Sequence, residues 1–108
     1  PDRLVQLGRK ELLAQAKRGD VIVIDVRPAD EYDTAHLPHA RSMPLSEIAE
    51  RLAELPRDQE IVAYCRGPFC LMSDEAVTLL RKQGFVACKT IDGVSEWQAA
   101  GLPVTRSA

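Results

Sequence analysis

Short apolar runs alternate along this chain with longer amphipathic segments. Residues 21–24 and 61–64 are continuously apolar, as is typical of strands that are covered on both faces of a parallel sheet. A shorter strand is expected around residues 42–43 and a last one over 86–91. Because a segment of different periodicity follows each apolar run, the pattern predicts an α/β fold with a parallel sheet and crossover helices.

Apolar residues at helical spacing, together with proline and glycine at the ends, predict the helices. Gly19 and Gly84 are placed to end two of them, and Pro28 to begin a third. The expected helical segments are 9–18, 28–32, 46–55, 72–84 and a short one that carries Trp97 and stops at Gly101.

The length and composition indicate one ordinary globular domain over residues 1–108. The chain is 45% hydrophobic and 28% charged, with a formal net charge of -2. Its charges are interspersed and form no basic stripe, so we expect no direct nucleic-acid partner. No apolar stretch reaches membrane-spanning length, so we expect no membrane partner either. A start at Pro1 without methionine indicates a processed chain or a piece of a longer protein.

The three cysteines favour a reducing, cytoplasmic setting. An odd number argues against a secreted disulfide framework. Cys65, Cys70 and Cys88 lack the spacing of a zinc-binding pair, and the two histidines lie elsewhere. We therefore expect no metal ion and no organic cofactor, and at least one working thiol.

Cys65 is the strongest candidate for a reactive residue. It follows the apolar run 61–64 and precedes a turn that contains Gly67 and Pro68, after which a helix is expected. Backbone N–H groups in such a turn and at a helix N-terminus favour negative charge. Together with the charge of Arg66, they predict a lowered pKa for the Cys65 thiol and a nucleophilic thiolate. The alternative is a small buried hydrophobic residue at a strand end.

Other polar residues follow the predicted strands as Cys65 does. Asp25 and Arg27 come after the first strand, and Asp92 after the last. Ligand sites in open α/β sheets lie beyond the carboxyl ends of the strands, so these residues are expected near one shared site. Asp25 and Arg27 are interpreted as framework that ties strand ends together, with Arg27 in an anion pocket as the alternative.

Four stretches of the chain resemble the rhodanese-like family of sulfurtransferases. They are residues 24–27, 32–40, 64–67 and 92–97, the last accompanied by 100–104. The resemblance implies a five-stranded, mostly parallel sheet flanked by helices on both faces. It also implies that Cys65 takes a sulfane sulfur as a persulfide. The donor would be a small sulfur-containing anion such as thiosulfate or a persulfide, and the acceptor cyanide or a thiol. The residues that would form the substrate-binding loop are Arg66, Gly67, Pro68, Phe69 and Cys70.

The loop sequence also resembles a particular group within that family. Residues 65–70 are cysteine, arginine, glycine, proline, an aromatic residue and cysteine. This loop sequence is similar to that of rhodanese domains fused behind winged-helix repressors. This similarity implies a regulatory domain fused to or associated with the chain. The sequence departs from the family pattern at His39, where glycine is usual, and in a slightly longer segment from Cys65 to Gly84.

Cys70 separates the alternatives in function. If its side chain faces Cys65, it can resolve a persulfide as an intramolecular disulfide, and the domain is then a persulfide- or redox-sensing module. If it faces the sheet, it fills the core. A phosphatase or arsenate reductase is disfavoured, because its arginine for oxyanion binding would stand at position 71, which is Leu71 here.

Overall fold

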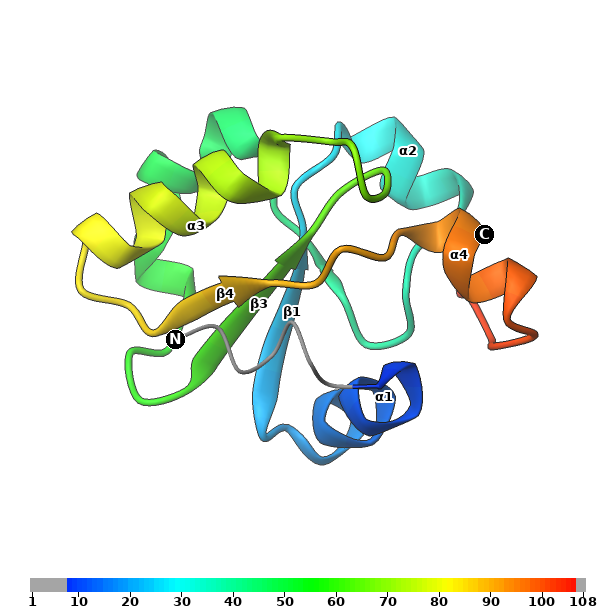
Figure 1. Cartoon of the computed structure of the whole chain (residues 1–108). Coiled ribbons are helices and arrows are strands. Elements are labelled where there is room, and N and C mark those ends of the chain that lie inside the picture. The colour runs from blue at the N-terminus through cyan, green and yellow to red at the C-terminus, as the bar shows by residue number, and fades with distance from the viewer. Residues whose placement is uncertain (1–7, 107–108) are drawn as a thin grey trace.

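Four parallel strands form the sheet of this protein, whose computed structural model describes residues 8–106. The spatial order is β2 (Arg41–Ser42), β1 (Val21–Asp25), β3 (Glu60–Tyr64) and β4 (Ala87–Lys89). Figure 1 shows β1, β3 and β4 side by side. The two central strands are nearly inaccessible to solvent, in keeping with their continuous apolar pattern. The α/β prediction is confirmed, and the last strand is shorter than predicted. The remainder of the predicted 1–108 domain, residues 1–7 and 107–108, lies outside the described residues.

The resemblance implied a sheet of five strands. This expectation is corrected here, because residues 8–106 form a sheet of four. The C-terminal stretch adds only one antiparallel bridge, between His36 and Thr105, with two backbone hydrogen bonds of 2.8 Å. In an antiparallel pairing that continues past His36 toward Pro38, the next hydrogen-bonded pair would join Pro38 to Pro103. Neither proline has an N–H group, so the bridge does not extend into a strand.

Helices cover both faces of the sheet (Figure 1). On one face lies α3 (Met72–Lys82), and on the other lie α1 (Arg9–Arg18) and α4 (Val94–Ala99). The helix α2 (Ala29–Thr34) follows β1. Each face has its own apolar core, so the doubly covered arrangement is as predicted. Within residues 8–106, no helix is both long enough and apolar enough to span a membrane.

The predicted helix over 46–55 is replaced by two 3-10 helices, η2 (Leu45–Glu50) and η3 (Leu52–Glu54). They are separated at Arg51, whose backbone has φ -114° and ψ 16°. The break allows Ile48 and Leu55 both to reach the core beside α3. The Arg51 side chain spans it, with salt bridges of 3.0 Å to Glu47 and 2.9 Å to Glu54. The apolar spacing was therefore predicted correctly, but the helix type was not.

Candidate active site

The carboxyl ends of β1 and β3 place the candidate residues at one edge of the sheet. The parallel register pairs Asp25 with Tyr64, so Val26 and Cys65 follow at the same level. The Val26 N–H group donates a 3.1 Å hydrogen bond to the Tyr64 carbonyl, which extends the pairing by one residue. Cys65 thus leaves the sheet at its centre, in the position that open α/β folds use for ligand sites.

The Cys65 thiol lies beneath the loop that joins β3 to α3. Its exposed fraction is 2%. The Cys65 Sγ atom lies 3.4 Å from the Cys70 carbonyl oxygen and 3.6 Å from the Ser73 Oγ atom, with the thiol as donor. The loop closes through a 3.2 Å hydrogen bond from the Cys70 N–H group to the Gly67 carbonyl. Gly67 has φ +155°, a backbone conformation that L side chains rarely adopt.

The two thiols of this loop differ in acidity, and the difference is opposite to the prediction. Burial, followed by the hydrogen bond with the Cys70 thiol, raises the pKa of Cys65, although Ser73 at the start of α3 works against the rise. At Cys70, burial is outweighed by the Cys65 thiol and by the N–H groups of Arg66 and Met72, so the pKa of Cys70 is lowered. The pKa of Cys70 therefore lies below that of Cys65, and the predicted low pKa of Cys65 is wrong.

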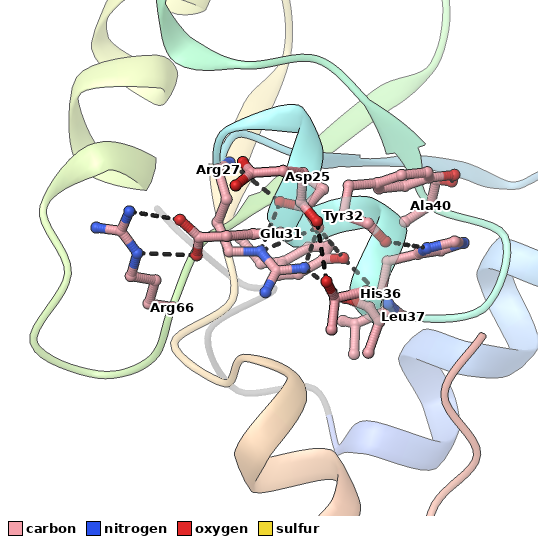
Figure 2. Close-up of polar contacts among 12 residues, drawn as sticks. Asp25, Arg27, Glu31, Tyr32, His36, Leu37, Ala40 and Arg66 are labelled. Carbon is pink, nitrogen blue, oxygen red and sulfur yellow. Dashed lines mark hydrogen bonds and ion pairs between the residues drawn. The ribbon is translucent and has the colours of Figure 1, made fainter. Parts of the chain in front are cut away.

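Arg66 forms a bidentate ion pair with Glu31 on α2 rather than pointing freely into the loop. Figure 2 shows the two side chains facing each other, with N···O distances of 2.9 and 2.6 Å. The hydrogen bonds from Arg66 lower the pKa of Glu31. The Arg66 side chain is 56% exposed, so its charge is largely screened by water as well as by its partner.

A pocket of about 690 Å³ opens over the loop. Cys70 lines it, whereas Cys65 does not. Two carboxylates, Glu75 and Glu96, also line it, and the aromatic side chain of Phe69 stands at its rim with 97% of its surface exposed. The other lining residues are Arg66, Gly67, Pro68, Leu71 and Met72. The structure thus brings all five predicted loop residues, Arg66 to Cys70, to one pocket, with Cys65 behind it.

Asp25 and Arg27 form a buried framework under this edge of the sheet (Figure 2). Their shortest N···O distance is 2.6 Å, and Arg27 also donates to the Ala35 carbonyl at 2.7 Å. The Tyr64 hydroxyl donates to Asp25 at 2.6 Å and accepts from the Leu37 N–H group at 3.0 Å. These contacts connect β1, β3 and the segment after α2. They are the contacts expected of a framework, and neither residue lines the pocket over the loop.

His36 is held in place by its neighbours in the turn after α2. Its ring stacks on Tyr32 with centroids 3.6 Å apart. Its Nδ1 atom lies 2.8 Å from the Tyr32 carbonyl oxygen, which can only accept, so Nδ1 carries the hydrogen.

Gly93 packs on the reactive loop, although the sequence alone marked it only within the stretch 92–97. A Cβ atom at this position would lie 2.6 Å from the Arg66 carbonyl oxygen and 2.7 Å from that of Cys65. The Gly93 N–H group donates to the Glu96 carboxylate at 2.7 Å, which begins α4. The backbone after β4 therefore packs directly on the reactive loop. Glycine next to Asp92 was the available signal, but its contact with Cys65 joins segments far apart in sequence.

The fold and the position of the thiol together make this a thiol-bearing α/β domain, with a cysteine at the centre of the carboxyl edge of a parallel sheet and beneath a short loop. The Rhodanese-like domain family matches residues 8–100, and the chain belongs to that family. The family predicted from the four sequence stretches is thereby confirmed.

Relatives of known description agree with this assignment. A sulfurtransferase of Allochromatium vinosum is 31% identical over 86 residues, which cover 79% of this chain and 78% of that protein. The HTH-type transcriptional regulator Rv0324 of Mycobacterium tuberculosis is 47% identical over 94% of this chain, and the match spans 45% of that regulator. The crystal structure of the BH2092 protein from Bacillus halodurans superposes with a TM-score of 0.82 at 31% identity, covering 91% of this chain and 74% of that one. Similarity to sulfurtransferases indicates a general role in sulfur transfer.

Proposed function

We propose that this domain moves a sulfane sulfur from a small donor to a thiophilic acceptor through a persulfide on Cys65. The observation that carries the proposal is the place of the Cys65 thiol. It lies at the carboxyl edge of the central strand, beneath a closed loop and within 3.6 Å of the Ser73 hydroxyl at the start of α3. A persulfide is anionic, and a helix N-terminus with its free N–H groups favours such a charge.

The reaction proceeds in two half-reactions. The Cys65 thiolate attacks the outer sulfur of thiosulfate, the S–S bond of the donor breaks, and sulfite leaves with the bonding electron pair. A cyanide ion or a thiolate then attacks the outer sulfur of the Cys65 persulfide and regenerates the Cys65 thiolate. The Cys65 thiol gives up its proton as it reacts, and Cys70, whose pKa is the lower of the two, accepts that proton when it is ionised.

The charges around the pocket favour a persulfide over thiosulfate as the donor. Among the described residues that line the pocket, Arg66 is the one basic residue, and Glu31 already neutralises it. Glu75 and Glu96 add two carboxylates. A dianion such as thiosulfate meets repulsion there, whereas a persulfide carries a smaller charge and an organic body that can contact Phe69.

A second candidate function is a sulfur- or redox-responsive regulatory module. The 3.4 Å contact between the Cys65 Sγ atom and the Cys70 carbonyl oxygen favours it, as does the similarity to a transcriptional regulator. The two functions share the persulfide on Cys65 and differ in the fate of that persulfide. In the regulatory module the modified state is long-lived and alters a fused or associated domain.

Intact mass spectrometry tests the proposal. The fully reduced protein is treated with thiosulfate or cysteine persulfide and kept free of reductant, with Cys65→Ser as the test variant and Cys88→Ala as the matched control. Cys88 lies on β4 in the core of the opposite face, away from the pocket. A sulfur that cyanide removes as thiocyanate, present in the control and absent from Cys65→Ser, supports the proposal. Turnover that survives in Cys65→Ser refutes it.

A further inference from the structure

Cys70 stands between the pocket and Cys65. Its side chain is half-buried and lines the pocket, while Cys65 is 2% exposed and does not line it. The Cys65 Sγ atom is 3.4 Å from the Cys70 carbonyl oxygen. The residue that carries the second thiol is therefore in contact with the sulfur atom that would carry the persulfide.

The loop also prepares Cys70 to react. Although burial works in the opposite direction, the Cys65 thiol and the neighbouring N–H groups of Arg66 and Met72 lower the pKa of Cys70. A thiolate, rather than a thiol, is the attacking form in exchange at a sulfur–sulfur bond. Cys70 thus lies where a nucleophile is needed and has the lower pKa of the two thiols, and the transfer reaction through Cys65 does not use it as a nucleophile.

Cys88 shows what a merely structural cysteine looks like in this fold. It is 3% exposed within β4 and packs in the core beside α1 and Trp97. Cys70 also packs against the core beside α3, but it differs from Cys88 in lying on a loop, in its partial exposure and in the 3.4 Å contact of its carbonyl oxygen with the Cys65 Sγ atom. Core filling alone does not account for this placement.

We propose that Cys70 is a second reacting thiol, which attacks the persulfide on Cys65, releases the transferred sulfur as hydrosulfide and leaves a Cys65–Cys70 disulfide. This inference rests on the proposed persulfide and adds an activity to it, the reductive release of a sulfane sulfur. The domain then discharges its own intermediate and does not depend on an external acceptor for the first turnover.

The atoms and electrons of the step balance without an outside oxidant. The proton that Cys70 received during loading passes to the outer sulfur of the Cys65 persulfide. The Cys70 thiolate then attacks the Cys65 Sγ atom, and the bond between that atom and the outer sulfur breaks. The outer sulfur leaves with the electron pair as hydrosulfide. The two cysteines are oxidised to the disulfide, and the sulfane sulfur is reduced.

Placement within the same loop gives Cys70 an advantage over free acceptors. Well-oriented intramolecular groups reach effective molarities of about 10⁵ M or more, far above any cellular thiol concentration. The disulfide then blocks a second loading until a dithiol reductant opens it. Each round therefore yields one hydrosulfide and consumes one dithiol.

The test measures sulfide and protein mass together. Reduced wild type, Cys70→Ser and Cys88→Ala are freed of reductant and treated with thiosulfate under argon. Sulfide is trapped with monobromobimane, and peptide mapping without reduction locates any disulfide. We expect wild type and Cys88→Ala to release one sulfide per chain and to lose two hydrogens, with Cys65 joined to Cys70. We expect Cys70→Ser to retain one added sulfur and to release no sulfide.

The contrary results separate this inference from the proposed function. A wild type that retains the added sulfur without sulfide or disulfide overturns the role of Cys70 and leaves sulfur transfer standing. Sulfide release from Cys70→Ser at the wild-type rate, or a wild-type disulfide formed without sulfide, overturns it too. If cysteine persulfide is tried as well and neither donor adds sulfur to Cys70→Ser or oxidises wild type, both proposals fail. The wild-type readout stands alone if Cys70→Ser does not fold.

Discussion

Tyr64→Phe removes one oxygen atom from the fully buried framework beside the active-site loop. The Tyr64 hydroxyl, on a side chain with no exposed surface, donates to Asp25 at 2.6 Å and accepts from the Leu37 N–H group at 3.0 Å. Arg27 continues to bind Asp25 in the variant, so the carboxylate stays paired. The Leu37 N–H group, in a residue that is 1% exposed, is left without this acceptor.

The cost arises from the loss of these two hydrogen bonds. A buried donor without an acceptor costs about 1–3 kcal/mol, and a hydrogen bond to a charged group contributes about 1.5–3 kcal/mol, part of which Arg27 recovers. We expect Tyr64→Phe to lower the free energy of unfolding by about 2–4 kcal/mol. At about 4–8 °C per kcal/mol, that loss lowers the Tm by roughly 10–30 °C.

Urea unfolding monitored by circular dichroism measures the loss, and Tyr32→Phe is the matched control. The Tyr32 hydroxyl makes one hydrogen bond, 2.7 Å to the Ala40 carbonyl, from a half-buried side chain, so its removal costs about 1 kcal/mol or less. Burial and then the Asp25 charge raise the pKa of Tyr64 far above its ordinary value. The hydroxyl therefore remains a donor, and the difference from wild type stays constant up to about pH 10. A Tyr64→Phe protein as stable as Tyr32→Phe would show that these hydrogen bonds do not stabilise the fold as argued.

Single contacts elsewhere in the structure lead to three more predictions. Gly93→Ala places a Cβ atom 2.6 Å from the Arg66 carbonyl oxygen. We therefore expect urea unfolding to show a free energy of unfolding lower by about 1–3 kcal/mol, and sulfur loading of Cys65 to be slower. The control Gly8→Ala, whose added Cβ atom has nothing within 4 Å, changes neither quantity. His39 has φ 67°, a backbone conformation that glycine adopts without strain, so we expect His39→Gly to raise the free energy of unfolding by about 0.5–1 kcal/mol. An equal gain in His39→Ala would contradict backbone strain as the cause. The pKa of Cys70 is lowered and that of Cys65 is raised, so we expect iodoacetamide at neutral pH to alkylate Cys70 first. Peptide mapping measures the order of labelling, and earlier labelling of Cys65 would contradict the order of the two pKa values.

Local patterns in the sequence were enough to predict most of the fold. The continuous apolar runs identified β1 and β3, and Gly19, with φ +79°, ends α1 as predicted. The run before Cys65 also placed that residue at a strand end. The type of helix over 45–54 was not predictable, because the break at Arg51 serves contacts of Ile48 and Leu55 with α3 rather than any local preference.

The candidate site was only partly predictable. The loop from Arg66 to Cys70 was identified from its residue types, and the pocket includes all of it. The partner of Arg66 was not, since Glu31 lies 35 residues away in sequence. The close approach of Gly93 to Cys65 likewise depends on the path of the chain after β4.

Residue types and their spacing were sufficient to predict the α/β class, the order of the main elements and a thiol at the carboxyl end of a central strand. These properties depend on periodicity and on neighbouring positions, which act over a few residues. Which of the two thiols has the lower pKa became clear only from the folded arrangement. Burial disfavours a thiolate at Cys65, while N–H groups and a neighbouring cation favour one at Cys70. The balance depends on solvent exclusion and on distances of a few ångströms between folded segments, which no local pattern encodes.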